Sequence, residues 1–281
     1  MAVARERRTM AEQIWDSFAR LNAGERFKRQ SAEMGSAVTE AIVEEARVLP
    51  GMKILDVACG SGEPSISIAA LLKGRGEVVG VDMAAEPLKV ARVRAEKRGL
   101  ENVEYIQADV HALPFGDNSF DRVTSRLGEM FFGDLGKALG EMRRVLKPGG
   151  RVALLAWGAM EQPYFETTIG TARRVRPELE VPAGARQMFK FGVQGTLALA
   201  LREAGFEEAE DRVRSLCWDW HGSAEELWNY FRAITVPFRA LLEKVEGDGA
   251  VDAAVLGALG ERFDGEYVRL DAQMVVATAV K

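Results

Sequence analysis

Two different spacings of apolar residues alternate along the middle of the chain. Short apolar runs bounded by glycine or charged residues predict buried strands at residues 52–58, 77–82, 103–107, 120–124 and 151–157. Helical spacing predicts intervening helices at 64–73, 87–98 and 135–146. Strands that are apolar throughout have both faces covered, and strands alternating with helices are typical of βαβ units. The pattern therefore predicts an α/β fold with a mainly parallel sheet.

The alternation weakens on both sides of this region. Helical spacing extends over three further segments, at residues 10–49, 159–190 and 223–262. A helix and two more strands are predicted at 196–204, 209–220 and 273–280. We expect a single domain over residues 1–281, in which 50–157 form the core and the three helical segments form a lid over a substrate.

Composition narrows the class of protein. The chain has 281 residues and a formal net charge of -5, which argues against binding nucleic acid through a basic surface. No apolar run approaches the roughly 18–20 residues that cross a bilayer, and no apolar stretch of a signal peptide follows the basic start. Cys59, Cys217, His111 and His221 are too few for a disulfide framework or a His-rich metal site. We expect a cytoplasmic protein with two free thiols and no metal.

A glycine loop follows the first predicted strand. Gly60, Ser61 and Gly62 precede a helix start, where the backbone can approach a ligand and unpaired N–H groups favour negative charge. Asp82 ends the second predicted strand, where a carboxylate can accept hydrogen bonds from both ribose hydroxyls. Together these features predict an adenosine-containing ligand, and they leave both NAD and S-adenosylmethionine open.

The residues around the loop favour S-adenosylmethionine. Ser65 stands where the dinucleotide-binding motif G-x-G-x-x-G/A has its third small residue. Glu63 would bring negative charge close to a pyrophosphate, whereas a ligand with an amino group and a sulfonium tolerates it. Asp56 lies inside the first strand, where its carboxylate can meet a cationic amino group; a helix-cap or turn role is the alternative.

Four segments carry a family resemblance. They are ILDVACGSG at 54–62, VGVDM at 79–83, ADVHALPF with NSFD at 108–121, and EMRRVLKPGG at 141–150. In order and spacing they resemble the class I S-adenosylmethionine-dependent methyltransferases, in the branch similar to ubiquinone/menaquinone C-methyltransferases and small-molecule methylases. The resemblance implies a Rossmann-like sheet of seven strands. The last strand, at 273–280, would run antiparallel beside the strand at 209–220.

The resemblance also implies cofactor contacts. Those expected at the methionine portion are Asp56, Gly60, Ser61, Gly62, Arg126 and Leu127, with Ala58 as a further cofactor contact. Those expected at the adenosine portion are Asp82, Met83, Asp109 and Val110. His111 departs from the family, which more often has alanine or an acidic residue there, so it is a candidate for both cofactor and substrate contact. The product would be S-adenosylhomocysteine.

The acceptor side is predicted from position in the fold. Ligands of open α/β sheets bind outside the carboxyl ends of the strands, which selects His111, Glu129 and His221 as candidate catalytic residues. Each has an alternative role: His111 would form a hydrogen bond within a surface loop, Glu129 would place its negative charge at a helix start, and His221 would lie at the entrance to a helix. Trp218 and Trp220 share one predicted strand face, where core packing is the default. The aromatic and apolar residues of 223–262 predict a partly apolar pocket and a small hydrophobic or aromatic acceptor.

Three other functions compete with methyl transfer to a small molecule. An NAD(P)-dependent reductase lacks its third loop glycine and a Tyr-x-x-x-Lys pair. A non-catalytic protein that binds S-adenosylmethionine would be expected to show damage in the glycine loop, which is intact. A nucleic-acid methyltransferase is disfavoured by the acidic balance and by Arg126-Leu127-Gly128-Glu129 in place of an Asn/Asp-Pro-Pro-Tyr/Phe motif. The sequence selects neither the methylated atom nor an oligomeric state.

Overall fold

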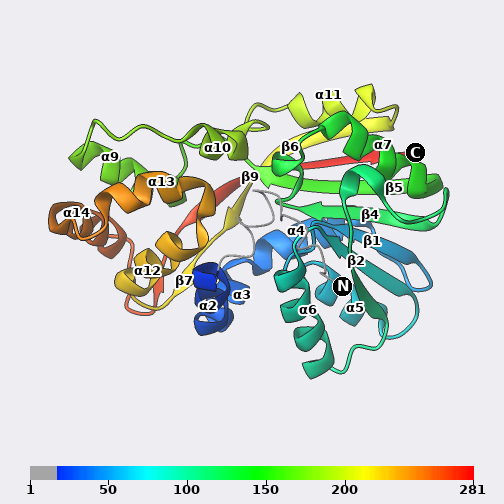
Figure 1. The fold of residues 1–281 in the computed structure, drawn as a ribbon, viewed down its shortest axis with the longest axis horizontal. Coiled ribbons are helices and arrows are strands. Elements are labelled where there is room, and N and C mark those ends of the chain that lie inside the picture. The colour runs from blue at the N-terminus through cyan, green and yellow to red at the C-terminus, as the bar shows by residue number, and fades with distance from the viewer. Residues whose placement is uncertain (1–17) are drawn as a thin grey trace, which may run out of the picture.

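The centre of the molecule is a seven-stranded sheet of order β3-β2-β1-β4-β5-β9-β6 (Figure 1). The computed structural model describes residues 18–281. The strands are β1 (Lys53–Val57), β2 (Glu77–Asp82), β3 (Val103–Gln107), β4 (Phe120–Arg126), β5 (Leu146–Trp157), β6 (Glu207–Cys217) and β9 (Asp271–Val280). β1 to β5 pair in parallel, and β9 lies antiparallel between β5 and β6. The predicted Rossmann-like sheet with an antiparallel last strand is confirmed.

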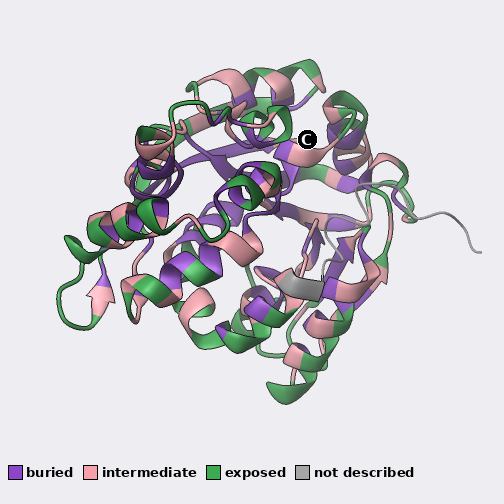
Figure 2. Cartoon of the chain, turned by 60° about the vertical axis from the view of Figure 1, so that its left-hand side comes forward, coloured by how far each residue is buried: buried purple, intermediate pink, exposed green. Residues whose placement is uncertain are grey.

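Helices cover both faces of this sheet. On one face pack α4 (Ser36–Ala46), α5 (Ser65–Leu72) and α6 (Ala85–Lys97); on the other pack α7 (Leu135–Val145) and α11 (Thr196–Glu203) (Figure 1). The apolar spacing of α7 places Ala138, Leu139, Met142 and Val145 against the sheet, where all four are buried. Figure 2 shows the same division, with buried strands in the centre and exposed residues on the outer sides of the helices.

The remaining helices form a lobe beside the sheet, on the left of Figure 1. They are α2 (Phe18–Arg26), α3 (Lys28–Met34), α8 (Pro163–Phe165), α9 (Thr171–Val175), α10 (Ala183–Arg186), α12 (Ala224–Ile234), α13 (Arg239–Leu242) and α14 (Gly249–Gly260). α2 packs on α12, and α14 packs on both α9 and α12. The three flanking helical segments therefore meet in space. The first of them begins before residue 18, and that part lies outside the described residues.

Short helical turns connect these elements. They are η1 (Val110–Ala112), η2 (Glu129–Phe131), the π-helical turn η3 (Glu166–Gly170), η4 (Gln187–Phe189), η5 (Val236–Phe238) and η6 (Glu243–Val245). The segment predicted as helical at 223–262 is broken first at Thr235, whose φ of -84° and ψ of 65° are not helical, because Pro237 has no N–H to continue the hydrogen bonds of α12. None of the helices in the described part of the chain is long and apolar enough to cross a bilayer.

The chain leaves the sheet earlier than the sequence predicts. The strand predicted at 209–220 ends at Cys217, and β7 (Trp220–His221) pairs instead with β8 (Tyr267–Val268) in a separate two-stranded sheet. Asp219 lies at the break. Its carboxylate accepts hydrogen bonds from the Leu270 N–H at 2.8 Å and from the Arg269 guanidinium at 2.7 Å. These bonds hold the turn that carries Trp220 away from the main sheet.

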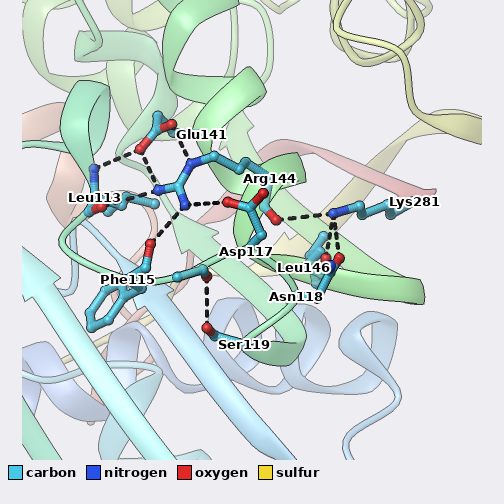
Figure 3. A network of polar contacts seen from close by, with 10 residues as sticks. Leu113, Phe115, Asp117, Asn118, Ser119, Glu141, Arg144, Leu146 and Lys281 are labelled. Carbon is cyan, nitrogen blue, oxygen red and sulfur yellow. Dashed lines mark hydrogen bonds and ion pairs between the residues drawn. The ribbon is translucent and has the colours of Figure 1, made fainter.

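Two of the motif segments are tied together by Arg144 of α7 (Figure 3). Its guanidinium donates to the carbonyl oxygens of Leu113 and Phe115 at 3.1 and 2.7 Å, and to the carboxylates of Asp117 and Glu141. The Glu141 carboxylate also accepts the Leu113 N–H at 2.8 Å. The segment that follows β3 is therefore held in place by α7.

Candidate active site

A cavity of about 1320 Å³ lies between the carboxyl ends of the strands and the helical lobe. On the sheet side it is lined by residues that end β1, β2, β4 and β5, among them Ala58, Asp82, Arg126 and Trp157. On the lobe side it is lined by residues of α2, α3, α8 and α12. The cavity is therefore where ligands of open α/β sheets bind.

The glycine loop forms one wall of this cavity. Gly60 and Ser61 line it, whereas Gly62 does not. Gly60 has a φ of +53°, and nothing lies within 4 Å of the position that its Cβ would take. Gly62 has a φ of +110°, and a Cβ there would lie 2.6 Å from Cδ1 of Ile66. Gly60 thus leaves the backbone open to a ligand, while Gly62 lets the loop pack on α5.

Asp82 connects the end of β2 to the loop. One carboxylate oxygen accepts the Gly60 N–H at 2.9 Å, and the other accepts the Ala84 N–H at 2.9 Å. Asp82 and the exposed Met83 both line the cavity. A carboxylate oxygen has a second lone pair, so Asp82 can accept further hydrogen bonds from a ligand while it holds the loop.

Asp56 lies beneath the loop and does not line the cavity. It is fully buried, and its carboxylate accepts hydrogen bonds from the N–H and hydroxyl of Ser65 and from the Thr124 hydroxyl at 2.9 Å. Burial raises the pKa of Asp56 to about 7, against the opposing effect of these bonds. The structure therefore corrects the expected direct contact with an amino group. Asp56 holds the start of α5, which was the alternative role.

Asp109 and His111 lie together after β3. The Nδ1 atom of His111 is 2.6 Å from the Asp109 carboxylate, which also accepts the His111 N–H at 2.9 Å. The Asp134 N–H donates to Nε2 of His111 at 3.2 Å, so the proton of a neutral ring is on Nδ1. Burial acts to raise the pKa of Asp109, but the bonds from His111 outweigh it and the pKa lies below its usual value. Asp109, Val110 and His111 all line the cavity.

The turn after β4 faces the glycine loop. Arg126 and Leu127 line the cavity, and Leu127 has a φ of +62°, as Ala58 after β1 has one of +56°. Left-handed backbone at two non-glycine residues beside a cavity is a strained arrangement of the kind found at ligand sites. The Arg126 guanidinium donates to the Thr39 hydroxyl at 3.2 Å and forms no ion pair among residues 18–281. Burial lowers the pKa of Arg126.

Two of the three candidate catalytic residues lie away from the cavity. Glu129 is fully buried, and neither carboxylate oxygen has a hydrogen-bond partner in the described part of the chain. His221 contacts Glu33 at 3.2 Å and Glu266 at 3.6 Å, and its ring stacks on Tyr267. Neither residue lines the cavity. The break after Cys217 carries His221 outward, so it joins α3 to the β7–β8 sheet rather than contacting an acceptor.

The far half of the cavity is aromatic. Trp157 and Tyr164 stack with centroids 5.9 Å apart, and Trp218 meets Trp157 edge-on at 5.3 Å. Of the residues that the sequence placed in an apolar pocket, those that line the cavity are Tyr230, Ile234 and Pro237. Those that are buried without lining it are Trp228, Phe231, Val236 and Phe238. Sequence reasoning missed Tyr164 and Thr235, because no periodic signal marks which side chains of a lobe face inward.

Comparison with known proteins places this geometry in a family. The model of the ubiE/COQ5 methyltransferase family matches residues 33–178, more than half of the chain. A demethylmenaquinone methyltransferase of Thermus thermophilus is 44% identical over 128 residues, which cover 42% of this chain and 56% of that protein. A ubiquinone/menaquinone biosynthesis C-methyltransferase of Shewanella frigidimarina is 43% identical over 179 residues, which cover 60% of this chain and 71% of that protein.

Solved structures share the fold at lower identity. A putative methyltransferase of Bacillus halodurans superposes with a TM-score of 0.54 at 23% identity, covering 86% of this chain and 98% of that one. A SAM-dependent methyltransferase of Aquifex aeolicus gives a TM-score of 0.53 at 22% identity, with 71% of this chain and 92% of that one covered. Sheet order, loop geometry and sequence similarity agree, and the chain belongs to the ubiE/COQ5 methyltransferase family.

Proposed function

We propose that the chain transfers a methyl group from S-adenosylmethionine to a small aromatic acceptor. One observation carries the proposal: a single cavity joins the glycine loop, Asp82 and Asp109 at one end to the aromatic side chains Trp157 and Trp218 at the other. A methyl donor and an apolar acceptor bound at the two ends would meet inside the same cavity. Membership of a methyltransferase family supports this reading.

The residues present fit the donor. The open space beside Gly60 accepts a ligand that approaches the backbone, and the Asp82 carboxylate lines the cavity at the end of β2, where it would accept hydrogen bonds from ribose hydroxyls. Asp109 and Val110 would face the adenine. Arg126, a half-buried cation with no ion pair among residues 18–281, would face the carboxylate of the methionine portion. Asp56 would act on this portion through Ser65 and the loop.

The chain's own part in the reaction is positioning and exclusion of water. S-adenosylmethionine supplies a methyl group bonded to a sulfonium, and the bonding electrons stay with sulfur when the methyl group leaves. Trp157, Phe165 and Trp218 surround the acceptor end with apolar surface, which excludes water from a reaction in which positive charge on sulfur disappears. Holding the acceptor atom in line with the methyl group, roughly 3 Å away, supplies much of the rate.

The acceptor class rests partly on relatives. The proteins named above as demethylmenaquinone and ubiquinone/menaquinone biosynthesis methyltransferases have quinone-type substrates in their names. However, much of the acceptor wall here comes from residues after the matched region, including Trp218, Tyr230 and Ile234. The aligned part of the Thermus protein is only 56% of its length. We therefore propose an aromatic acceptor of quinone-precursor type, and we infer that the residues of this wall select the substituents on its ring.

Calorimetry with S-adenosylmethionine, S-adenosylhomocysteine and NADH tests the donor assignment. We expect the first two to bind and NADH not to bind; binding of NADH alone would overturn the proposal in favour of a reductase. Asp82→Ala is expected to weaken S-adenosylmethionine binding at least tenfold, since hydrogen bonds to a charged group contribute about 1.5–3 kcal/mol. The exposed Asp271→Ala, outside the cavity, is the matched control. Release of S-adenosylhomocysteine across a panel of aromatic metabolites then separates an enzyme from a non-catalytic binding protein.

A further inference from the structure

Arg94 of α6 contacts both the glycine loop and the helical lobe. One terminal nitrogen of its guanidinium, Nη1, donates to the Ser61 hydroxyl at 3.0 Å and to the Ser61 carbonyl oxygen at 3.3 Å. The other, Nη2, lies 3.3 Å from the Glu25 carboxylate of α2. All three residues line the cavity. Arg94 therefore connects the loop at the donor end of the cavity to a helix of the lobe.

The contact with Glu25 fixes the direction of the guanidinium more than it stabilises the fold. The Arg94 side chain is 29% exposed and that of Glu25 is 49% exposed, and an ion pair this close to water contributes little to stability. However, a guanidinium is planar and rigid, so a carboxylate on one nitrogen sets where the N–H groups of the other nitrogen point. Because α2 is itself held by packing on α12, the lobe sets the N–H group that reaches Ser61.

The contact with Arg94 decides how the Ser61 hydroxyl can act on a ligand. A guanidinium has only donors, so the Ser61 oxygen must accept from Arg94, and its own O–H points elsewhere. Within residues 18–281 that O–H donates to no other group, and Ser61 is half-buried on the cavity wall. A positive charge 3.0 Å from the oxygen favours an anionic group beside it and disfavours a cationic one. The hydroxyl is therefore prepared to donate to an anion.

The other arginine at the end of α6 acts on a different part of the loop. Arg98 lies 3.5 Å from the Glu63 carboxylate, which also accepts the Ser67 hydroxyl at 2.6 Å. Its charge is thus directed at an acidic side chain of the loop. Of these two arginines, Arg94 is the one whose charge reaches a hydroxyl on the cavity wall.

We propose that Arg94 is a positioning residue for the methyl donor: it orients the Ser61 hydroxyl to donate a hydrogen bond to the carboxylate of the methionine portion. The proposal rests on the proposed function for the identity of that ligand. Arg126, at the turn after β4, would face the same carboxylate, so that this group would have two donors. Glu25 precedes the region that the family model matches, so its part in the arrangement does not follow from family membership.

The affinities for two ligands, measured by calorimetry, test the proposal without requiring turnover. The ligands are S-adenosylhomocysteine and its decarboxylated form, which keeps the adenosine, the sulfur and the amino group and lacks only the carboxylate. The variants are Ser61→Ala, Arg94→Met and the double variant, with Glu25→Gln as a weaker perturbation of the guanidinium. Lys89→Met is the matched control, because it removes an ion pair of 2.6 Å with Glu86 from the same helix, outside the cavity.

We expect Ser61→Ala and Arg94→Met each to weaken S-adenosylhomocysteine binding about five- to twentyfold, since a hydrogen bond to a charged group is lost or misdirected. Neither should weaken binding of the decarboxylated form. The double variant should bind S-adenosylhomocysteine within about threefold of Ser61→Ala alone, because Arg94 acts through the hydroxyl. Glu25→Gln should weaken binding of S-adenosylhomocysteine alone, by about two- to fivefold. Lys89→Met should change neither affinity.

Equal losses for both ligands would show that Arg94 supports the loop as a whole, and would overturn the proposal. Additive losses in the double variant would also overturn it, because Arg94 would then act independently of the Ser61 hydroxyl. An unchanged affinity of Ser61→Ala for S-adenosylhomocysteine would do the same. The proposed function fails differently, by a failure of the unchanged protein to bind S-adenosylhomocysteine. A protein that binds it and shows equal losses keeps the donor assignment and loses the role of Arg94.

Discussion

Gly128 and Ala58 lie so close together that a Cβ on Gly128 would be 2.5 Å from the Cβ of Ala58. The two residues belong to the turns that follow β4 and β1, and both line the cavity. Gly128 has a φ of -100°, which any residue can adopt, so glycine is required here by contact and not by backbone conformation. The close approach sets the spacing between the glycine loop and the Arg126 turn.

Gly128→Ala should therefore disturb the donor end of the cavity. The added methyl group would also lie 2.8 Å from the Ser125 hydroxyl, so the two turns must separate. We expect a loss of about 1–3 kcal/mol in the free energy of unfolding, as for overpacked cores, and at least a tenfold loss of S-adenosylmethionine affinity. Urea denaturation and calorimetry measure the two effects. Gly140→Ala, in α7 with nothing within 4 Å of its added Cβ, is the control.

His111 is expected to orient Asp109 and not to transfer a proton. Both ring nitrogens are engaged, one by the Asp109 carboxylate at 2.6 Å and the other by the Asp134 N–H at 3.2 Å. His111→Ala should weaken S-adenosylmethionine binding about three- to tenfold, as expected for the loss of one hydrogen bond to a carboxylate. At saturating donor, turnover of an acceptor found in the metabolite panel should fall less than threefold. A loss of about a hundredfold or more would instead indicate general acid–base catalysis.

Glu129 should make the protein less stable at high pH. Burial raises the pKa of Glu129 from 4.5 to about 8, so the native state favours the protonated carboxyl group. Its stabilising contribution is complete below the unfolded-state pKa and is lost as the pH rises through about 8. Glu129→Gln, which cannot ionise, should reduce the loss of unfolding free energy between pH 5 and pH 9 by about 1–4 kcal/mol, given about 1.4 kcal/mol per pKa unit.

Urea denaturation at the two pH values measures this difference. The exposed Glu101→Gln is the control, and it should leave the pH dependence as it is in the unchanged protein. Some loss of stability with rising pH should persist in Glu129→Gln. Burial also raises the pKa of Asp56 to about 7, so ionisation of Asp56 destabilises the native state in the same direction. An identical pH dependence in Glu129→Gln and the unchanged protein would show that Glu129 does not ionise in this range.

Arg144→Lys should not behave as a conservative change. The Arg144 guanidinium contacts two carbonyl oxygens and two carboxylates at once, a fork geometry that an ammonium group cannot reproduce (Figure 3). We expect a loss of about 2 kcal/mol in the free energy of unfolding, since several hydrogen bonds to charged groups are lost or weakened. Arg143→Lys, in the same helix, is the control: the Arg143 guanidinium donates to the Gly205 carbonyl at 2.8 Å, and its replacement should change stability by less than about 1 kcal/mol.

The sheet and the donor end of the cavity could be predicted from the sequence because their signals are local. Apolar strands alternate with amphipathic helices, and Gly60, Asp82 and Asp109 each lie at or just beyond the carboxyl end of a strand, so parallel topology alone brings them to one edge. Asp56 is the instructive exception. It has the right position in the chain, but Ser65 and Thr124 surround its carboxylate, and only packing decides whether a strand residue faces a ligand or the core.

The acceptor end was decided by tertiary structure. Tyr164, Trp218 and Thr235 come from segments separated by many residues, and which of their atoms point inward depends on how the lobe packs against the strand ends. The same dependence on packing explains why the predicted catalytic residues His221 and Glu129 do not line the cavity. A break at Asp219 moves His221 outward, and burial under the cavity wall encloses Glu129. Local spacing determines secondary structure and the residues that follow each strand, whereas a wall made from distant segments exists only after they pack.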